Sequence, residues 1–427
     1  MIGFLLCVFY LNLDHPVYDI LPVLYISGEI KNLPIDRPYD LDGLLSSELL
    51  KKYVGKRWKF FSYFFADVFY CDSLGFHLSA SFYYSDKFFS LGWQGIGGTL
   101  EGLPLARPWR GEVPFRTPYM GFINKQGYLS FTFKRTEFLF GRFPLLEGPG
   151  WNSGLLVSPK PYDVLMMKYK INDRIKLKYF VLFLDKYEED SVIYKRWFSF
   201  HEISIRFKGL TLGLSEAILY GRTSYVPELY YLNPVLLWIA SQHNCWEDDN
   251  LFFKLEFALD LRGLRIYGEF LVDDFQYAPD PRGEPNEIGG IIGVQKYFKN
   301  EFLNYLWIEY RAVTAWVYNQ KHPRNRLIYY GECLGNEFGP DGDKLLIKLG
   351  RLKSGRLMEL EAYIQRKGEN EIETQWPDVF PGDYFLTGKV KRDFGMILKC
   401  ILVPQYRFEI GMGTKDKILR FVYTVSF

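Results

Sequence analysis

The long connections of this sequence combine large aromatic rings with side chains that form strong hydrogen bonds. Aromatic faces stack on the apolar faces of sugar rings, while amides, carboxylates and guanidinium groups pair with hydroxyl groups. The residues of this kind are Trp93, Trp109, Arg110, Trp151, Asn152, Gln242, Asn244 and Trp246. The combination suits contact with carbohydrate, and it is equally the composition of an aromatic girdle at a membrane interface.

The other reactive residues do not indicate catalytic chemistry. Only five histidines occur, and the sequence has no HExxH, GxSxG, P-loop or dinucleotide motif. His201 stands beside Glu202 on an alternating segment, where an ordinary lumen or surface histidine is the simpler interpretation. The five cysteines are far apart and form no CxxC pair, which argues against a zinc site. We therefore predict that the chain is not an enzyme and holds no cofactor or metal.

The composition excludes two further classes. The chain has 427 residues, of which 19% are aromatic, and a net charge of only +2. So much apolar surface is incompatible with disorder, and so small a charge gives no reason to expect a nucleic-acid partner. The sequence has no run of about eighteen apolar residues, the length that a membrane-spanning helix needs.

From Lys56 onward, apolar and polar residues alternate, which is the period of a β-strand with one buried face. In one such segment, Leu255 stands between Lys254 and Glu256. The clearest segments are 175–183, 252–261, 264–273, 356–365 and 418–427. Each is about ten residues long, enough to cross a bilayer when tilted.

Short turns and long connections alternate along this part of the chain. The short turns are predicted at 172–173, 208–209, 262–263, 299–300 and 353–355, and the long connections at 144–162, 220–249, 274–287, 316–343 and 366–383. A membrane barrel with short periplasmic turns and longer extracellular loops shows this arrangement. Strand direction then requires an extra strand at 87–98 and one long strand over 395–412, with Pro404 at a bulge or near its end. We predict an all-β transmembrane barrel of about 18 antiparallel strands, closed, in a bacterial-type outer membrane.

The expected inward face of the barrel carries charges of both signs. Its members are Lys176, Lys178, Lys254, Glu256, Asp260, Arg265, Glu269, Asp273, Glu359, Glu361, Arg407 and Glu409. A strongly ion-selective pore usually shows one dominant sign at its constriction. The mixture therefore favours a lumen packed with ion pairs.

The last strand carries a possible assembly signal. Phe427 is the terminal residue, and Val425, Tyr423 and Phe421 precede it at every second position. This pattern resembles the signal that bacterial outer-membrane barrels present to the barrel-assembly machinery, which we expect to be a partner. The alternative is a soluble β protein that ends on a strand.

The N-terminal part does not alternate. Residues 1–13 are apolar and are interpreted as a possible atypical signal segment. Residues 14–55 are predicted to form a short periplasmic helical segment, with one helix ending at Gly28 and a second starting near Asp40. The barrel is expected over residues 56–427.

A series of short motifs, in order along the chain, resembles the capsule assembly protein Wzi family. The series comprises Phe140-Gly141-Arg142, Gly148-Pro149-Gly150-Trp151, Gly154-Leu155-Leu156-Val157-Ser158, Gly213-Leu214-Ser215-Glu216 with Tyr220, Leu232-Asn233-Pro234 with Gln242 and Asn244, Asp273-Asp274-Phe275, and Gly335 with Gly339-Pro340-Asp341 and Asp343. The N-terminal pattern HPVYD…GEI…RPY also resembles the start of this family. Together the motifs span nearly the whole chain.

The resemblance implies an eighteen-stranded outer-membrane barrel that acts as a lectin and holds capsular polysaccharide at the cell surface. It implies no enzyme activity and no cofactor, and we expect a monomer surrounded by outer-membrane lipid. The candidate polysaccharide-binding residues are Arg142, Glu147, Trp151, Asn152, Glu216, Asn233, Gln242, Asn244, Asp273 and Asp274. The segment Phe143-Pro144-Leu145-Leu146 departs from the family, because it lacks the tryptophan often found there.

Two other functions remain open from the sequence. The chain could be a porin that passes small solutes, which a bilayer conductance recording distinguishes from a lectin. It could also have mainly structural or assembly duties, which an absence of glycan binding together with a blocked pore would favour.

Two local predictions follow from backbone geometry. The glycines around Pro149 permit a tight reversal with positive φ, and if this loop folds into the lumen, Glu147 and Arg142 would pin it. Glu216 alternates with Leu212 and Leu214, so it would face lipid at a cost of a few kcal/mol. We therefore predict a bulge near Ser215 or a position of Glu216 at the rim.

Overall fold

The computed structural model describes residues 17–30, 37, 60–71, 73–85, 89–99, 115–116, 120–151, 153–245, 247, 249–276, 281–354, 356–403, 406–413 and 417–426. The predicted helix near Asp40, the segment 1–13, and Trp109, Arg110, Asn152, Trp246 and Phe427 lie outside the described residues. No helix among the described residues has both the length and the apolar character needed to cross a membrane.

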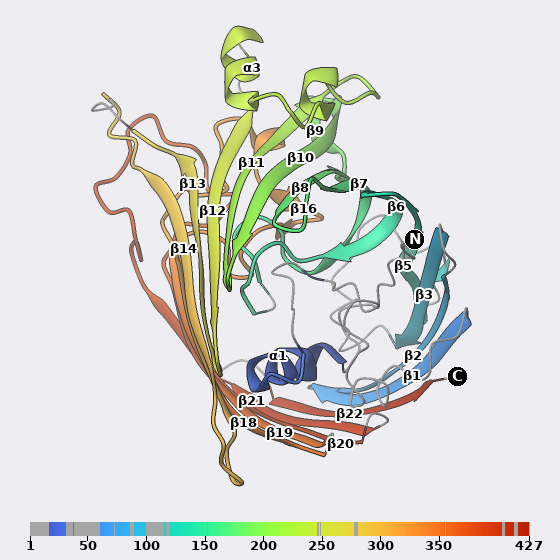
Figure 1. The fold of residues 1–427 in the computed structure, drawn as a ribbon. Coiled ribbons are helices and arrows are strands. Elements are labelled where there is room, and N and C mark those ends of the chain that lie inside the picture. Colours follow the sequence, from blue (N-terminus) through green and yellow to red (C-terminus); the bar gives the residue numbers. More distant parts are fainter. Residues whose placement is uncertain are drawn as a thin grey trace.

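One antiparallel sheet forms the wall, and it closes on itself because the first and last strands pair, Phe64 opposite Val425 (Figure 1). The sheet has 20 strands, of which β4 (Phe115–Arg116) and β9 (Tyr187–Glu189) are short additions. The 18 wall strands of the described chain are β1 (Phe60–Cys71), β2 (Ser73–Ser85), β3 (Phe89–Thr99), β5 (Met120–Phe133), β6 (Thr136–Leu145), β7 (Lys160–Lys170), β8 (Ile175–Phe183), β10 (Val192–Phe207), β11 (Leu210–Arg222), β12 (Asn250–Leu261), β13 (Leu264–Asp274), β14 (Glu287–Tyr297), β15 (Tyr305–Val313), β18 (Gly342–Lys353), β19 (Arg356–Lys367), β20 (Lys391–Val403), β21 (Tyr406–Gly413) and β22 (Lys417–Ser426). The predicted closed all-β barrel of about 18 strands is confirmed.

The two faces of the wall follow the alternation in the sequence. In β12 the side chains of Lys254 and Glu256 are buried inside, whereas Leu255 between them is half exposed on the outside. In β19 Glu359 is buried and its neighbour Met358 is exposed. Large apolar side chains are exposed on the outside of many strands, among them Phe140, Leu165, Leu214, Ile292 and Ile364. An outward apolar surface with polar groups facing inward is the pattern of a barrel surrounded by lipid.

Short and long connections lie at opposite ends of the barrel. The hairpin between β10 and β11 turns at Lys208 and Gly209, which have φ of 43° and 109°. Turns at Gly263 and Ser354 lie at the same end, also with positive φ. The long connections, including 146–159, 223–249, 275–286, 314–341 and 368–390, all lie at the other end, as strand direction requires.

The strand predicted at 87–98 is present as β3, but the single strand predicted over 395–412 is wrong. Here the chain forms two paired strands, β20 and β21, and the ladder shifts register between Ile401 and Val403. Val403 pairs with Tyr406, so the chain reverses between these two residues. Pro404, which has no N–H for a continuous ladder, stands in this interval of the sequence and lies outside the described residues. With both strands present, β22 still ends at the short-turn end.

Two further sheet strands and four helical pieces complete the described chain. β16 (Ile328–Tyr329) pairs with β17 (Glu332–Cys333) as a separate two-stranded sheet. The helical pieces are α1 (Val17–Ser27), η1 (Leu229–Leu232), α3 (Trp238–Cys245) and η2 (Pro323–Asn325). Helix α1 ends where predicted, at Gly28, whose φ is +88°.

Helix α1 lies inside the ring of strands (Figure 1). Its residues Val17, Ile20, Leu21 and Leu24 are fully buried. The carboxylate of Asp19 pairs with Lys399 of β20 at 2.8 Å and with Arg407 of β21 at 3.4 Å. The helix therefore fills the lumen rather than standing apart from the barrel.

Candidate functional site

The connection between β6 and β7, residues 146–159, folds back into the barrel, and we call it the inner loop. Leu155, Leu156 and Val157 are fully buried. Gly148 has a φ of +100°, and a Cβ there would lie 2.2 Å from Oε1 of Glu269. The predicted tight reversal with positive φ and close packing is therefore confirmed at this glycine.

The inner loop is tied to the wall by backbone groups that meet buried carboxylates. The N–H of Trp151 donates to Glu309 at 2.9 Å, and the N–H of Leu155 donates to Glu269 at 3.1 Å. Arg311 donates to the carbonyl oxygen of Trp151. Each buried carboxylate thus satisfies an amide that would otherwise be stranded away from water.

The ring of Trp151 is enclosed by cations and a second indole. Lys348 Nζ lies 3.5 Å from the ring centroid, and the guanidinium of Arg37 lies 5.3 Å away. The ring of Trp307 meets it edge-on with centroids 4.7 Å apart. The face that could stack on a sugar is therefore already covered by Lys348.

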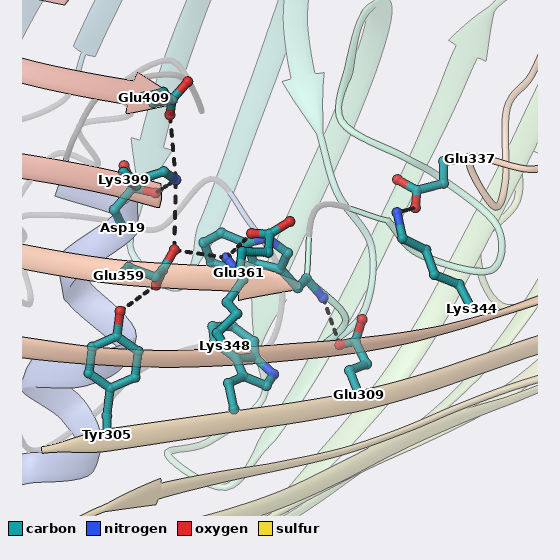
Figure 2. Close-up of polar contacts among 12 residues, drawn as sticks. Asp19, Tyr305, Glu309, Glu337, Lys344, Lys348, Glu359, Glu361, Lys399 and Glu409 are labelled. Atoms are coloured by element: carbon teal, nitrogen blue, oxygen red, sulfur yellow. Dashed lines mark hydrogen bonds and ion pairs between the residues drawn. The ribbon is translucent and has the colours of Figure 1, made fainter. Parts of the chain in front are cut away.

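A chain of charges continues from this tryptophan along the inner wall (Figure 2). Lys348 pairs with Glu361 at 2.6 Å and with Glu359 at 3.2 Å. Glu359 also accepts a hydrogen bond from Tyr305 and lies 3.9 Å from Lys399, which leads on to Asp19. Burial opposes ionisation of Asp19, but the attraction of Lys399 and Arg407 outweighs it and holds the pKa of that carboxyl well below its usual range.

A second group of charges lies across the lumen. Lys178 pairs with Glu147 of the inner loop and with Glu202 at 3.3 Å. Lys254, with 0% exposed surface, pairs with Glu256 at 2.6 Å. Glu147 therefore pins the inner loop as predicted.

The predicted role of Arg142 in pinning the loop is not what the structure shows. Its guanidinium makes a two-pronged pair with Asp163 of the adjacent strand β7, at 3.0 and 2.8 Å. The two residues lie directly opposite in the ladder, so the nearest carboxylate captures the side chain. The expected ion-pair filling of the lumen is confirmed for the described residues.

The connection 223–249, which we call the outer loop, covers the outside of the wall above β10 and β11. Tyr231 of η1 packs against Tyr220, and Trp238 of α3 stacks on His201 with centroids 4.1 Å apart. Glu216 accepts hydrogen bonds from the backbone N–H groups of Trp238 at 2.9 Å and Ile239 at 2.7 Å. This carboxylate caps the first turn of α3.

Of the two alternatives predicted for Glu216, the bulge near Ser215 is wrong, because both ladders of β11 run without a register shift past it. Glu216 is the seventh of the 13 residues of β11 rather than a residue at either end of the strand. Glu216 keeps the outward direction that alternation gives it. The covering outer loop and His201, 3.0 Å away, supply its hydrogen bonds, and the side chain is buried. Protein rather than lipid therefore meets this charge.

Three other candidate residues lie in the outer loop. Asn233 accepts hydrogen bonds from the N–H of Val235 at 3.1 Å and from the indole of Trp238 at 3.2 Å. Gln242 donates to the carbonyl of Asp249 at 2.6 Å. Asn244 is exposed on α3.

Connections 275–286, 314–341 and 368–390 pack together at the same end, and we call them the loop cluster. Trp316, Trp376 and Phe380 form an edge-on aromatic group with centroids 5.2–5.7 Å apart. The indole N–H groups of both tryptophans are buried and have no hydrogen-bond partner within the described part of the chain. The carbonyl oxygen of Tyr384 accepts a hydrogen bond from the N–H of Ala315, the residue before Trp316, and Tyr384 and Phe385 each have 39% of their surface exposed.

One buried carboxylate joins two connections of the loop cluster. Asp341 accepts hydrogen bonds from the N–H of Asn370 at 3.0 Å and from the hydroxyl of Thr387 at 2.6 Å. Its own φ is +57°. The resemblance motif that contains Asp341 therefore marks the residue that organises these loops.

The last two sequence candidates lie at the end of β13, beside the loop cluster. Asp273 accepts a hydrogen bond from the backbone of Tyr318, whose φ of 72° is uncommon for an aromatic residue. Asp274 is exposed at the end of β13. Connection 368–390 of the loop cluster also contains two exposed carboxylates, Asp378 and Asp383.

The structure does not bring the ten sequence candidates into one site. Glu147 and Trp151 lie in the lumen, and Asn152 is outside the described residues. Asn233, Gln242 and Asn244 lie in the outer loop. The other four lie on wall strands: Arg142 on β6, Glu216 on β11 beneath the outer loop, and Asp273 and Asp274 at the end of β13 beside the loop cluster. The aromatic group at Trp316 and Trp376 was missed. Its positions in long connections rich in tryptophan and tyrosine were the available signal.

The fold and this arrangement define a closed outer-membrane-type barrel whose lumen is filled by its own loops and helix. The solved structure of Wzi from Escherichia coli, described as an outer-membrane protein involved in group 1 capsule assembly and as a carbohydrate-binding β-barrel, is similar to this one. The TM-score is 0.66 and the sequence identity 14%, and 99% of each chain is covered. This likeness shows the fold, and the predicted resemblance to Wzi is confirmed at that level.

Other outer-membrane barrels align less well. OccD3 (OpdP) from Pseudomonas aeruginosa aligns with a TM-score of 0.45 and 8% identity, over 86% of this chain and 91% of that one. OccAB1 from Acinetobacter baumannii aligns with a TM-score of 0.45 and 9% identity, over 86% and 95%. No protein-family model and no curated protein matches the sequence.

Proposed function

We propose that this chain is an outer-membrane barrel that binds surface or capsular polysaccharide through its loop cluster and helps attach or organise it at the cell surface. The observation that carries the proposal is the contrast between a filled lumen and an exposed aromatic surface. The inner-wall cations Lys254 and Lys348 have no exposed surface, so the wall supports loops rather than lining a wide aqueous path.

The loop cluster offers the chemistry that a polysaccharide needs. Tyr384 and Phe385 provide partly exposed ring faces for stacking on sugar rings. Asp378 and Asp383 provide acceptors for hydroxyl groups. The connections are held in place by Asp341, so little ordering is needed when a ligand binds.

The likeness to Wzi supports the same reading, because it extends over 99% of both chains. Placement in the outer membrane is supported by the outward apolar side chains of the wall, such as Leu214 and Ile292. We further propose that the barrel works as a monomer and that β22, which contains Phe421, Tyr423 and Val425, is recognised by the barrel-assembly machinery. Catalysis plays no part in the proposal.

Binding of the purified, lipid-reconstituted protein to the surface polysaccharide of its own source bacterium tests the proposal. We expect saturable binding in calorimetry or surface plasmon resonance. A Tyr225→Ala protein is the control for a variant that lacks the rings of Tyr384 and Phe385, because Tyr225 is an exposed aromatic residue of the outer loop and not of the loop cluster. Absence of saturable binding to the wild-type protein would refute the lectin function.

A planar-bilayer recording tests the alternative porin function. With the lumen filled, we expect no large, steady single-channel steps from the wild-type barrel. Such steps, together with an absence of glycan binding, would show that the barrel is a porin rather than a lectin.

A further inference from the structure

The outer loop descends along the outside of the wall toward its apolar surface. At the level of Tyr220 the wall is covered by Tyr231, and four residues lower, at Glu216, it is covered by the start of α3. The next outward pair below is Ile203 opposite Leu214, which are 40% and 56% exposed. The start of α3 therefore lies next to the outward apolar surface of the barrel.

Three consecutive apolar side chains, Val235, Leu236 and Leu237, form the segment of the outer loop just before α3. They immediately precede Trp238, whose N–H is held by Glu216. Val235 is 82% exposed and Leu237 is 67% exposed. Leaving such large apolar surface in water is unfavourable.

We propose that residues 235–237, the apolar tip of the outer loop, insert into the outer leaflet of the membrane around the barrel, with Glu216 acting as the positioning residue. The occupant is lipid because the tip is continuous with the outward surface at Leu214. The alternative occupant, a second copy of this chain, is distinguished by the experiment below. The inference rests on the outer-membrane placement proposed above.

The position of Glu216 explains how a buried charge can lie beside lipid. Its two oxygens receive the N–H groups of Trp238 and Ile239 and the ring of His201, so the charge is matched within protein. The same bonds fix the backbone that follows the tip. An apolar segment next to the bilayer interface is stabilised by burial at the boundary between headgroups and acyl chains.

Site-directed spin labelling of the lipid-reconstituted barrel tests the proposal. Single cysteines are introduced at 235, 237, 214 and 244 in a background whose native cysteines are replaced by alanine, and each label is exposed to oxygen and to a water-soluble nickel chelate. We expect labels at 235 and 237 to be relaxed more by oxygen than by nickel, as at 214. The label at 244, on the exposed end of α3, should show the reverse order.

The controls separate the two proposals. If 214 reports lipid but 235 and 237 report water, the membrane tip is refuted while the barrel placement stands. If 214 also reports water, the outer-membrane placement itself fails. Spin–spin broadening between labels at 235 would show a second copy of the chain on the tip and would overturn the lipid assignment.

A Glu216→Ala change tests the positioning role. The label at 235 should lose its preference for oxygen and become more mobile, while the label at 214 keeps its lipid signature. A Glu228→Ala change is the matched control, because Glu228 lies in the same loop but pairs with Arg222. An unchanged signal at 235 in the Glu216→Ala protein would contradict the role of this carboxylate.

Discussion

The inner loop and the loop cluster differ in what they leave available. In the inner loop, the side chains of Trp151 and Glu147 are turned inward: Lys348 covers the ring of Trp151, and Glu147 pairs with Lys178. In the loop cluster, Asp341 holds the backbone while Tyr384 and Phe385 stay partly exposed. The same residue types therefore serve as filling in one region and as candidate contact surface in the other.

This contrast separates the effects of substitution. Changes in the lumen should lower stability and leave any intrinsic ligand contact intact. Changes on the loop cluster should leave stability nearly unchanged and weaken ligand binding. The four predictions below run from the largest expected effect on stability to the smallest.

Replacing Glu309 should have the largest effect. Glu309 accepts hydrogen bonds from Trp151 and Tyr267 and pairs with Arg311, and all these groups are buried. A Glu309→Ala change leaves the guanidinium and the amide without this partner and should cost about 3–5 kcal/mol. Thermal unfolding followed by circular dichroism measures the loss, and bilayer recording should show new conductance through the loosened lumen.

The control is Glu337→Ala, which removes a more exposed partner of Arg311 at 3.4 Å. We expect this change to be much milder. Equal stability of the Glu309→Ala protein and the wild type would show that the buried contacts do not hold the inner loop.

Replacing Gly148 should have the next largest effect. An alanine there would have its Cβ 2.2 Å from Oε1 of Glu269, at a φ of +100°. The collision and the backbone strain together should cost about 1–3 kcal/mol. Protease cleavage within the inner loop provides a direct measurement.

Gly331→Ala separates strain from collision, because Gly331 has a φ of +79° but nothing within 4 Å of its Cβ position. It should lose only about 1 kcal/mol from the backbone conformation. If both glycines lose the same amount, the close packing on Glu269 is unimportant.

Acid should weaken the docking of α1 by a smaller amount. The pKa of Asp19 is held below its usual range in the docked helix by Lys399 and Arg407, which overcome the effect of burial. A lowered pKa stabilises the docked state above about pH 4, the value for a free carboxyl, and this stabilisation is lost as the pH falls further. At pH 3 the loss should be about 1 kcal/mol.

Hydrogen exchange of the α1 amides measured between pH 3 and pH 6, corrected for intrinsic rates, checks this prediction. Protection should fall toward pH 3 in the wild type. In an Asp19→Asn protein it should be lower throughout and independent of pH in this range. A wild-type profile that stays flat would exclude the ion pair as the source of docking energy.

Much of the fold can be predicted from the alternation of apolar and polar residues along the sequence. The alternation around Leu255 predicts the inward and outward faces. The count of 18 is confirmed, although one of the two strand-direction requirements behind it, the single strand over 395–412, is wrong. The error over 395–412 arose because the pattern continues on both sides of Pro404, so periodicity alone cannot show a hairpin. The alternation of residue types does not show where one strand ends and the chain turns back into the next.

The candidate site was harder to predict for a physical reason. Trp151 has the residue type expected for sugar contact, but its accessibility depends on Lys348, almost two hundred residues later in the chain. Alternation predicted the outward direction of Glu216, but the hydrogen bonds of its buried carboxylate depend on the distant Trp238. Side-chain type is local information, whereas exposure is created by contacts between distant segments.

The smallest effect on stability, with the largest on binding, is expected at the exposed rings of the loop cluster. A Tyr384→Ala, Phe385→Ala double change removes partly exposed side chains and should alter stability by within about 0.5 kcal/mol, as for surface positions generally. It should weaken polysaccharide binding about tenfold or more, because two stacking contacts of about 0.5–1.5 kcal/mol each are lost. Calorimetric titration with the same polysaccharide measures the affinity, and thermal unfolding confirms that the barrel is intact. A stable double variant with wild-type affinity would show that the loop cluster is not the binding surface. Retained affinity in the Glu309→Ala protein would show that the lumen supports the loops without contacting the polysaccharide.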